Sequence, residues 1–162
     1  MRIITMLVFT MILTRGDLFA QLEVFQTPLK TLEGKTTRIS DFLGQKPTIL
    51  SFWATWCLPC KKELDAITEI YPYWQESFGV QLIAVSIDNA RAIPRIKPMI
   101  SEKEWPFIIM TDSNQALMRA LNFQTIPQTF LINPEGLIVY RHSGYLPGDE
   151  LELESHLERI SP

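Results

Sequence analysis

The sequence predicts one α/β domain with a mixed central sheet flanked by helices. Thr48–Trp53 and residues 80–87 are nearly continuous apolar runs, which is typical of strands buried on both faces. A helical pattern joins them, and a strand–helix–strand unit of this length forms a parallel pair with a right-handed crossover. Near the C-terminus, a turn sequence at residues 133–136 separates two further apolar segments and predicts an antiparallel hairpin.

Composition supports one folded domain and argues against several functions. The chain has 162 residues, of which 46% are hydrophobic and 20% charged, as in an ordinary globular protein. The net charge of −3 provides no basic field for a nucleic-acid backbone, so we expect no nucleic-acid partner. The 2 cysteines are too few for a multi-disulfide scaffold or an all-cysteine zinc site.

The N-terminal segment has the features of a secretory signal peptide. Arg2 provides positive charge, and residues 3–13 form an uncharged, mainly apolar run. Arg15 and Asp17 end this run short of the ~20 apolar residues that a membrane-spanning helix needs. We expect cleavage after Ala20, which would leave residues 21–162 as the exported domain.

The next elements are a hairpin and one helical turn. Residues 29–32 and 36–39 flank Glu33-Gly34-Lys35, a short turn in which glycine accepts a positive φ. Residues 40–43 read as a helical turn that Gly44 closes.

A long helix is expected over residues 58–77, between the two buried strands. Its predicted apolar face consists of Leu64, Ile67, Ile70 and Trp74. Pro72 lies inside it and should kink or interrupt it. The second half predicts a helix at 93–100, a strand at 107–111, a helix at 114–121, hairpin strands at 128–132 and 137–141, and a last helix at 148–160.

The two cysteines, Cys57 and Cys60, lie where the first buried strand gives way to the long helix. Free N–H groups and the helix dipole at this position stabilise a thiolate at Cys57, and Lys61 and Lys62 add positive charge. Cys60 lies about one turn further along and suits a resolving role. Pro59 fits the first helical turn because its missing N–H costs nothing there.

Three plainer interpretations of the cysteine pair compete. A structural disulfide would close so short a loop that it would stabilise little. A zinc site would need two more ligands, and His142 and His156 lack the usual finger spacing. A chance pair of buried cysteines at this junction is the third. Redox chemistry is the favoured interpretation.

Residues 52–63 resemble the active-site segment of thioredoxin-fold proteins, and in particular the TlpA/ResA-like family of exported thiol–disulfide oxidoreductases. They read Phe-Trp-Ala-Thr-Trp-Cys-Leu-Pro-Cys-Lys-Lys-Glu. The similarity continues through residues 33–35 upstream and through residues 125–132 and 135–136 downstream, so it spans nearly all of residues 21–162. It implies a thioredoxin-like fold with an extra N-terminal β-hairpin.

The resemblance also implies roles for individual residues. Cys57 would be the attacking thiol and Cys60 the resolving thiol. Pro127 would be a cis-proline that faces the disulfide, and the Ile126 backbone would pair with an extended substrate. Trp56 and Pro59 complete the expected substrate-contacting residues. Trp53 would flank the site, with core packing as its plainer role.

Two residues depart from the usual pattern. Ordinary thioredoxins have a buried Asp where this chain has Ser51, which cannot act as that base. Glu63 is the substitute candidate for a catalytic role, because it follows Cys60 by three residues on the same helix face and matches the ResA-like members. A solvated surface charge beside Lys62 is its alternative. Asp65 replaces a proline of many relatives and should affect only the helix kink.

The expected function is reduction of disulfides in extracytoplasmic proteins, such as an apocytochrome c or a copper-site protein. The resemblance implies a membrane thiol–disulfide transporter as reductant, a monomeric protein, and no cofactor or metal besides the redox-active Cys57–Cys60 disulfide. The location would be periplasmic or otherwise extracytoplasmic, with a membrane tether if the signal stays on.

Two alternatives stay open from the sequence. A dithiol oxidant or isomerase would use the same pair, although Ile126 before Pro127 resembles the reductants more. A copper-delivery or redox-sensing module would use Cys57, Cys60 and His142 as soft ligands. A thioredoxin-fold peroxidase is weaker, since it would not need this pair.

Overall fold

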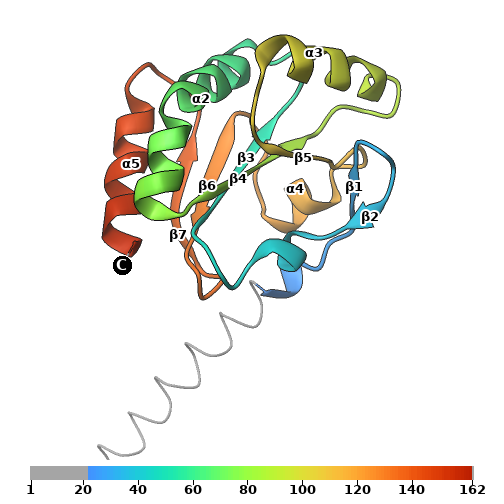
Figure 1. The fold of residues 1–162 in the computed structure, drawn as a ribbon. Coiled ribbons are helices and arrows are strands. Elements are labelled where there is room, and N and C mark those ends of the chain that lie inside the picture. The colour runs from blue at the N-terminus through green and yellow to red at the C-terminus, as the bar shows by residue number, and fades with distance from the viewer. Residues whose placement is uncertain (1–21, 162) are drawn as a thin grey trace, which may run out of the picture.

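A seven-stranded mixed sheet forms the centre of the protein in a computed structural model that describes residues 22–161 (Figure 1). The strand order is β2-β1-β5-β4-β3-β6-β7. β3 and β4 pair in parallel, as do β4 and β5, whereas all other neighbours are antiparallel. The strands are β1 (Leu29–Thr31), β2 (Thr36–Thr37), β3 (Thr48–Trp53), β4 (Gln81–Ser86), β5 (Ile108–Thr111), β6 (Gln128–Ile132) and β7 (Ile138–Ser143). The mixed sheet predicted from the sequence is confirmed.

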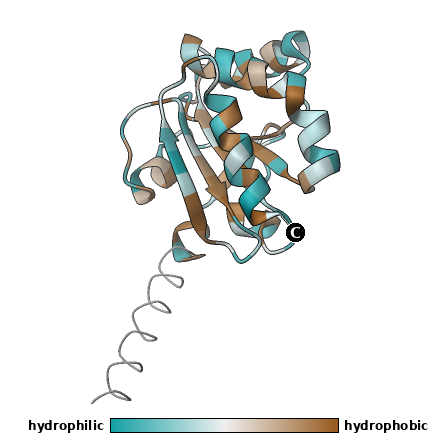
Figure 2. Ribbon diagram, turned by 90° about the vertical axis from the view of Figure 1, so that its left-hand side faces the viewer, coloured by the Kyte–Doolittle hydropathy of each residue, from teal (hydrophilic) through white to brown (hydrophobic). Residues whose placement is uncertain are grey.

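Helices cover both faces of this sheet. They are α2 (Leu58–Phe78), α3 (Ile96–Lys103), α4 (Ala116–Ala120) and α5 (Asp149–Ile160), with 3₁₀ turns η1 (Ile39–Phe42) and η2 (Ile93–Arg95). α2 and α5 lie side by side on one face, where the Trp74 indole N–H donates to the Glu154 carboxylate at 2.7 Å, and α4 lies on the other (Figure 1). The strands of the sheet carry long hydrophobic stretches, while the helices carry both hydrophobic and hydrophilic residues (Figure 2).

The core is built around β3, whose six residues are all buried. Phe52 of β3 stacks edge-on against Phe123 and Phe130, with ring centroids 4.7 and 6.0 Å away. A strand that packs on both faces needs the continuous apolar run that the sequence shows. β3 is therefore a rigid element, and the active-site candidates follow directly from its end.

Of the kink or interruption expected at Pro72, the interruption does not occur. One helix runs from Leu58 to Phe78 through the proline. Packing outweighs the lost hydrogen bond here, because Tyr71 and Trp74 on either side of Pro72 are buried, and the Leu82 N–H donates to the Tyr71 hydroxyl at 2.9 Å. The helix expected at 93–100 divides instead into η2 and α3.

The N-terminal hairpin is confirmed and is joined to the sheet. β1 pairs with β2 and also with β5, where Lys30 lies opposite Thr111. The helical turn expected at residues 40–43 is the 3₁₀ turn η1, one residue earlier. The expected signal peptide, residues 1–20, lies outside the described residues. Within residues 22–161 we find no helix long and apolar enough to cross a bilayer.

Candidate active site

Cys57 and Cys60 form a disulfide at the N-terminus of α2, with Cα atoms 5.4 Å apart. Cys57 is the N-cap residue, and the Cys60 N–H donates to its Sγ at 3.3 Å. When the pair is reduced, this donor and the helix dipole favour a Cys57 thiolate. Cys60 has no exposed surface, whereas Cys57 is 4% exposed. In the sequence, Cys57 lies between Trp56 and Leu58, whose side chains are exposed.

The loop before Cys57 is fixed by a buried carboxylate. Asp88, just beyond the end of β4, accepts hydrogen bonds from the Thr55 N–H, the Thr55 hydroxyl and the Ser86 hydroxyl, each at 2.8 Å. The Lys61 ammonium donates to the Thr55 carbonyl at 3.1 Å. The backbone that presents Cys57 is therefore tied to both the parallel strand and the active-site helix. Neither Thr55 nor Asp88 was singled out from the sequence.

Pro127 reaches the same end of the sheet through strand pairing. β6 runs antiparallel to β3 with Gln128 opposite Phe52, so the residue before Gln128 lies near the end of β3. The Ile126–Pro127 peptide bond is cis, as the resemblance implied. The Pro127 carbonyl accepts from the Gly144 N–H at 2.9 Å, whereas no hydrogen bond joins the Ile126 backbone to another described residue. Half-buried Ile126 can thus offer its backbone to an extended chain.

Glu63 is buried, so its interpretation as a solvated surface charge is wrong. The residue is 4% exposed, and its carboxylate accepts hydrogen bonds from the Thr129 hydroxyl at 2.8 Å and the Ser51 hydroxyl at 3.2 Å. Burial raises the pKa of Glu63 to about 7, and the two hydroxyls lower it by less. The Ser51 hydroxyl helps to hold the Glu63 carboxyl group in place. Thr129 was not found from the sequence.

A small cavity lies beside Glu63, between α2, β6, β7 and α5. Its volume is about 10 Å³, close to the minimum for one water molecule, and Tyr140, His142 and Asp149 are among its lining residues. His142 Nε2 lies 3.0 Å from Asp149 Oδ2. His142 is therefore engaged with α5 rather than with the cysteines. No group of three or more His, Cys, Asp or Glu side chains in residues 22–161 is arranged to hold a metal, and Cys57, Cys60 and His142 do not form such a group.

The two tryptophans differ in kind. Trp53 is fully buried and packs edge-on against Trp105, with ring centroids 5.0 Å apart, so core packing is its role. Trp56 is 68% exposed beside Cys57. Pro59, in the first turn of α2, is exposed as well. Asp65 accepts from the Lys103 ammonium at 2.6 Å and the Trp105 indole N–H at 2.9 Å, so it fastens α2 to the segment around α3.

Comparison with known proteins places this geometry in a family. Residues 20–141 match the AhpC/TSA family. The chain belongs to that family. Within it, the chain is 31% identical over 131 residues to the thiol-disulfide oxidoreductase ResA of Bacillus thuringiensis, covering 81% of this chain and 72% of ResA.

Solved structures with similar folds support this assignment. A thioredoxin-like protein from Porphyromonas gingivalis is 41% identical with a TM-score of 0.74, covering 83% of this chain and 88% of that one. StoA from Bacillus subtilis is 33% identical with a TM-score of 0.63, covering 79% and 94%. This member of the AhpC/TSA family is therefore a thioredoxin-fold thiol–disulfide oxidoreductase of ResA type, and its redox centre is a cysteine pair.

Proposed function

We propose that this oxidoreductase works outside the cytoplasm as a reductant of protein disulfides. The observation that carries the proposal is the position of the Cys57–Cys60 disulfide, at a helix N-terminus and at the sheet end where the Ile126 backbone is free to pair. A strand-like substrate segment would lie along Ile126 and Pro127, with exposed Trp56 and Pro59 at its side. Such pairing selects extended protein chains rather than small disulfides.

The reaction has two exchange steps. The Cys57 thiolate attacks one substrate sulfur, a Cys57–substrate disulfide forms, and the other substrate sulfur leaves as a thiolate. Cys60 then loses its proton and attacks Cys57 Sγ, which releases the second substrate sulfur. Two electrons pass to the substrate, and the protein ends as the Cys57–Cys60 disulfide. A membrane thiol–disulfide transporter would restore the dithiol.

Glu63 would take the proton of Cys60 in the second step. Cys60 and Glu63 are both buried on the core-facing side of α2, three residues apart. A carboxyl group whose pKa lies about 7 can both accept and return a proton near neutral pH. The cavity beside it would connect Glu63 to water, so that the proton need not leave past the bound substrate.

The substrates would be exported proteins whose cysteines must be reduced before a cofactor is attached, such as an apocytochrome c or a copper-site protein. The family resemblance and the similarity to ResA support this assignment. An oxidant would use the same two exchange steps in reverse, so the direction is decided by the reduction potential rather than by geometry.

The division of labour between the cysteines is tested by trapping. Cys60→Ser should accumulate mixed disulfides with oxidised protein substrates, because Cys57 still attacks but nothing releases the product. Cys57→Ser should accumulate far fewer, since Cys60 has no exposed surface. The adducts are counted on non-reducing gels and identified by mass spectrometry. Equal trapping by the two variants would show that the roles are assigned wrongly.

A further inference from the structure

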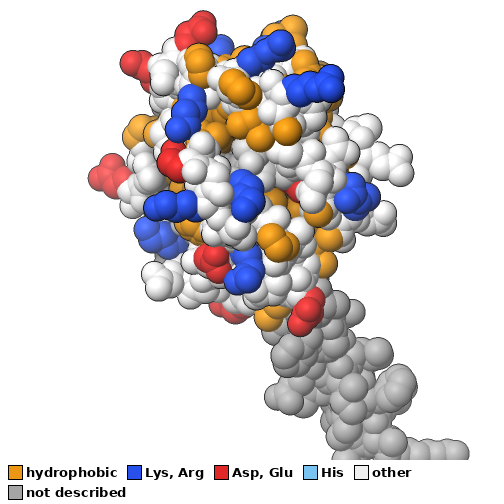
Figure 3. Space-filling model, turned by 90° about the vertical axis from the view of Figure 1, so that its right-hand side faces the viewer, with side chains coloured by type: hydrophobic (Ala, Val, Ile, Leu, Met, Phe, Trp, Pro, Cys, Tyr) orange, Lys and Arg blue, Asp and Glu red, His pale blue; other side chains and the backbone are white. Residues whose placement is uncertain are grey.

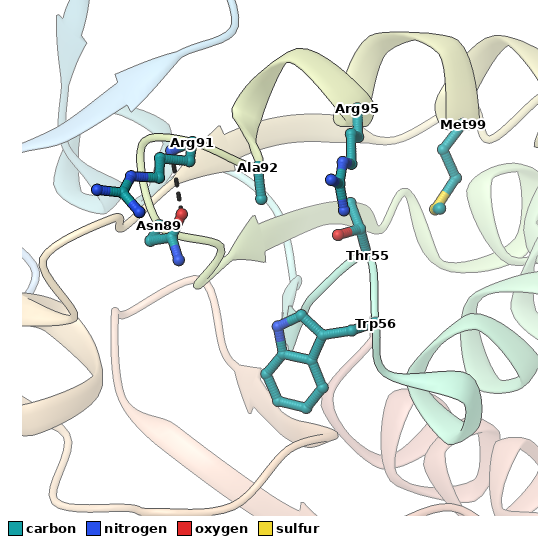
Figure 4. A pocket seen from close by; sticks show the side chains of 7 residues that line it. All are labelled: Thr55, Trp56, Asn89, Arg91, Ala92, Arg95 and Met99. Carbon is teal, nitrogen blue, oxygen red and sulfur yellow. Dashed lines mark hydrogen bonds between the residues drawn. The ribbon is translucent and has the colours of Figure 1, made fainter.

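A hollow beside Trp56 has no role in the exchange steps. It has a volume of about 480 Å³ and is lined by Thr55 and Trp56 after β3, by the segment after β4, and by η2 and α3 (Figure 4). This volume is in the range of ligand-binding pockets. Trp56 directly precedes Cys57, so the hollow adjoins the segment that carries the attacking cysteine.

Two arginines give the hollow its chemistry: the Arg95 guanidinium extends towards Thr55, whereas the Arg91 side chain lies at the opposite end of the hollow from Met99 (Figure 4). Arg91 and Arg95 line it, and neither side chain makes a hydrogen bond or ion pair within residues 22–161. The neighbouring cations differ, because Lys97 pairs with Glu33 at 3.3 Å and Lys103 with Asp65 at 2.6 Å. No Asp or Glu lines the hollow. Two unpaired guanidiniums in an acidic protein favour a carboxylate, which a guanidinium can bind through two parallel hydrogen bonds.

The remaining lining indicates a peptide rather than a small ion. The exposed Trp56 ring, Ala92 and Met99 offer apolar contact, and Thr55 and Asn89 offer polar atoms. The side-chain oxygen Oδ1 of Asn89 accepts from the Arg91 backbone N–H at 3.0 Å, which fixes the turn that carries Arg91 (Figure 4). On the face that α3, β1 and β2 share, basic side chains lie among hydrophobic ones (Figure 3). An extended chain with an acidic side chain beside an apolar one matches this mixture.

We propose that the hollow binds an acidic residue close in sequence to the reacting cysteine of a protein substrate, with Arg91 and Arg95 as specificity-determining residues. This inference rests on the proposed reduction of protein disulfides. The hollow would add a preference for acidic substrates to the backbone pairing at Ile126, because backbone hydrogen bonds alone do not discriminate between side chains. Substrate cysteines with a nearby Asp or Glu would react faster than those without one.

The test uses single-cysteine peptides whose sulfur is joined to thionitrobenzoate. The Cys57 thiolate of the reduced protein attacks the peptide sulfur, the bond to thionitrobenzoate breaks, and the coloured thiolate leaves with its electron pair. Each peptide carries one Glu at one of the four positions nearest the cysteine, and its partner carries Gln there. The ratio of the two rates removes any general effect of a variant on Cys57 reactivity.

At low salt we expect the Glu peptide to react roughly fivefold faster for at least one position, as suits exposed ion pairs. The ratio should fall towards one in the Arg91→Gln/Arg95→Gln double variant. It should persist in Arg159→Gln, which removes an exposed arginine at the far end of α5. A rate ratio of one at all positions in the wild type would overturn the inference. A fall of the ratio in Arg159→Gln as large as that in the double variant would also overturn it.

Two further results separate this inference from the proposed function. Equal and rapid reaction of all peptides leaves disulfide exchange standing and overturns only the charge preference. No reaction with any peptide overturns both. The mixed disulfide of glutathione and thionitrobenzoate is tested as a further substrate, because glutathione is a small anionic thiol that could bind the hollow in place of a peptide. An arginine-dependent rate for glutathione alone would mean that the hollow serves a small thiol, which also overturns the inference.

Discussion

At the scale of single residues, Glu63 is the most unusual side chain of the site. Folding removes its carboxyl group from water and replaces the lost hydrogen bonds with those from two hydroxyl donors, Ser51 and Thr129. A buried carboxylate without a cationic partner is costly, which is why its pKa rises from 4.5 to about 7. Such a residue is kept at a cost in stability, as expected for a group that moves a proton.

Glu63→Gln should remove a pH-dependent loss of stability. Below pH 4.5 the carboxyl is protonated in both states, so it carries no penalty. As the pH rises from 4.5 to about 7, the unfolded chain ionises first, and stability falls. Above pH 7 the loss is complete, at about 3 kcal/mol. Urea unfolding of the oxidised protein at pH 5 and pH 8 should show this loss in wild type and not in Glu63→Gln.

The matched control is Glu69→Gln, an exposed glutamate on the same helix, which should keep the wild-type pH dependence. In the reduced protein, Glu63→Gln should also lower the pKa of at least one thiol, because a nearby negative charge is gone, and slow the release of the mixed disulfide. Parallel unfolding curves for wild type and Glu63→Gln at both pH values, with unchanged thiol titrations, would contradict the role given to this carboxyl group.

Sequence spacing predicted part of this arrangement. The i, i+3 relation places Glu63 on the same side of the helix as Cys60. Its burial could not be read from the helix alone, because the groups that enclose it come from β3, β6 and α5. The tie between Asp88 and Thr55 is likewise formed only when β3 and β4 lie in parallel register, 33 residues apart in the chain.

At the scale of elements, Asp88 joins the end of β4 to the loop that carries Cys57. Asp88→Asn keeps the shape but replaces one acceptor oxygen with an NH₂ group, which faces a donor. Since Asp88 is 1% exposed, the unpaired group is not solvated. We expect a loss of about 1–3 kcal/mol in the free energy of unfolding, and faster hydrogen exchange at the Thr55 amide.

Thr55→Val is the comparison variant, because it removes only the hydroxyl donor and keeps the Thr55 N–H bond to Asp88. It should destabilise less and leave the amide protected. If Asp88→Asn unfolds at the wild-type urea concentration and the Thr55 amide stays protected, the tie does not hold the loop.

Element types were predicted more reliably than their ends. The buried strands β3 and β6 were predicted with their observed bounds, because both are dominated by apolar and β-branched residues. Pro72 does not interrupt α2, because tertiary packing on both sides of the proline outweighs the local tendency of proline to break a helix. η2 and α3 were merged, since a 3₁₀ turn and an α-helix share nearly the same apolar spacing.

At the scale of the whole molecule, the proposed location can be tested directly. Export should remove residues 1–20, as the charged start and apolar run predict. We expect N-terminal sequencing of the protein from its natural host to begin at or near Gln21, with the protein in an extracytoplasmic fraction. A protein that starts at Met1 and is recovered from the cytosol would contradict the proposed location, while leaving the disulfide chemistry in place.

The central claim is that the Cys57–Cys60 pair acts as a reductant. The helix N-terminus favours the Cys57 thiolate and thus the reduced form, whereas buried Glu63 disfavours a second anion near it. The reduction potential of the pair, measured at pH 7 against a dithiothreitol or glutathione buffer, reports the balance of these effects. We predict a value near the thioredoxin end of the range, about −270 mV. A value near about −120 mV would mean that the pair is an oxidant, and would contradict the account.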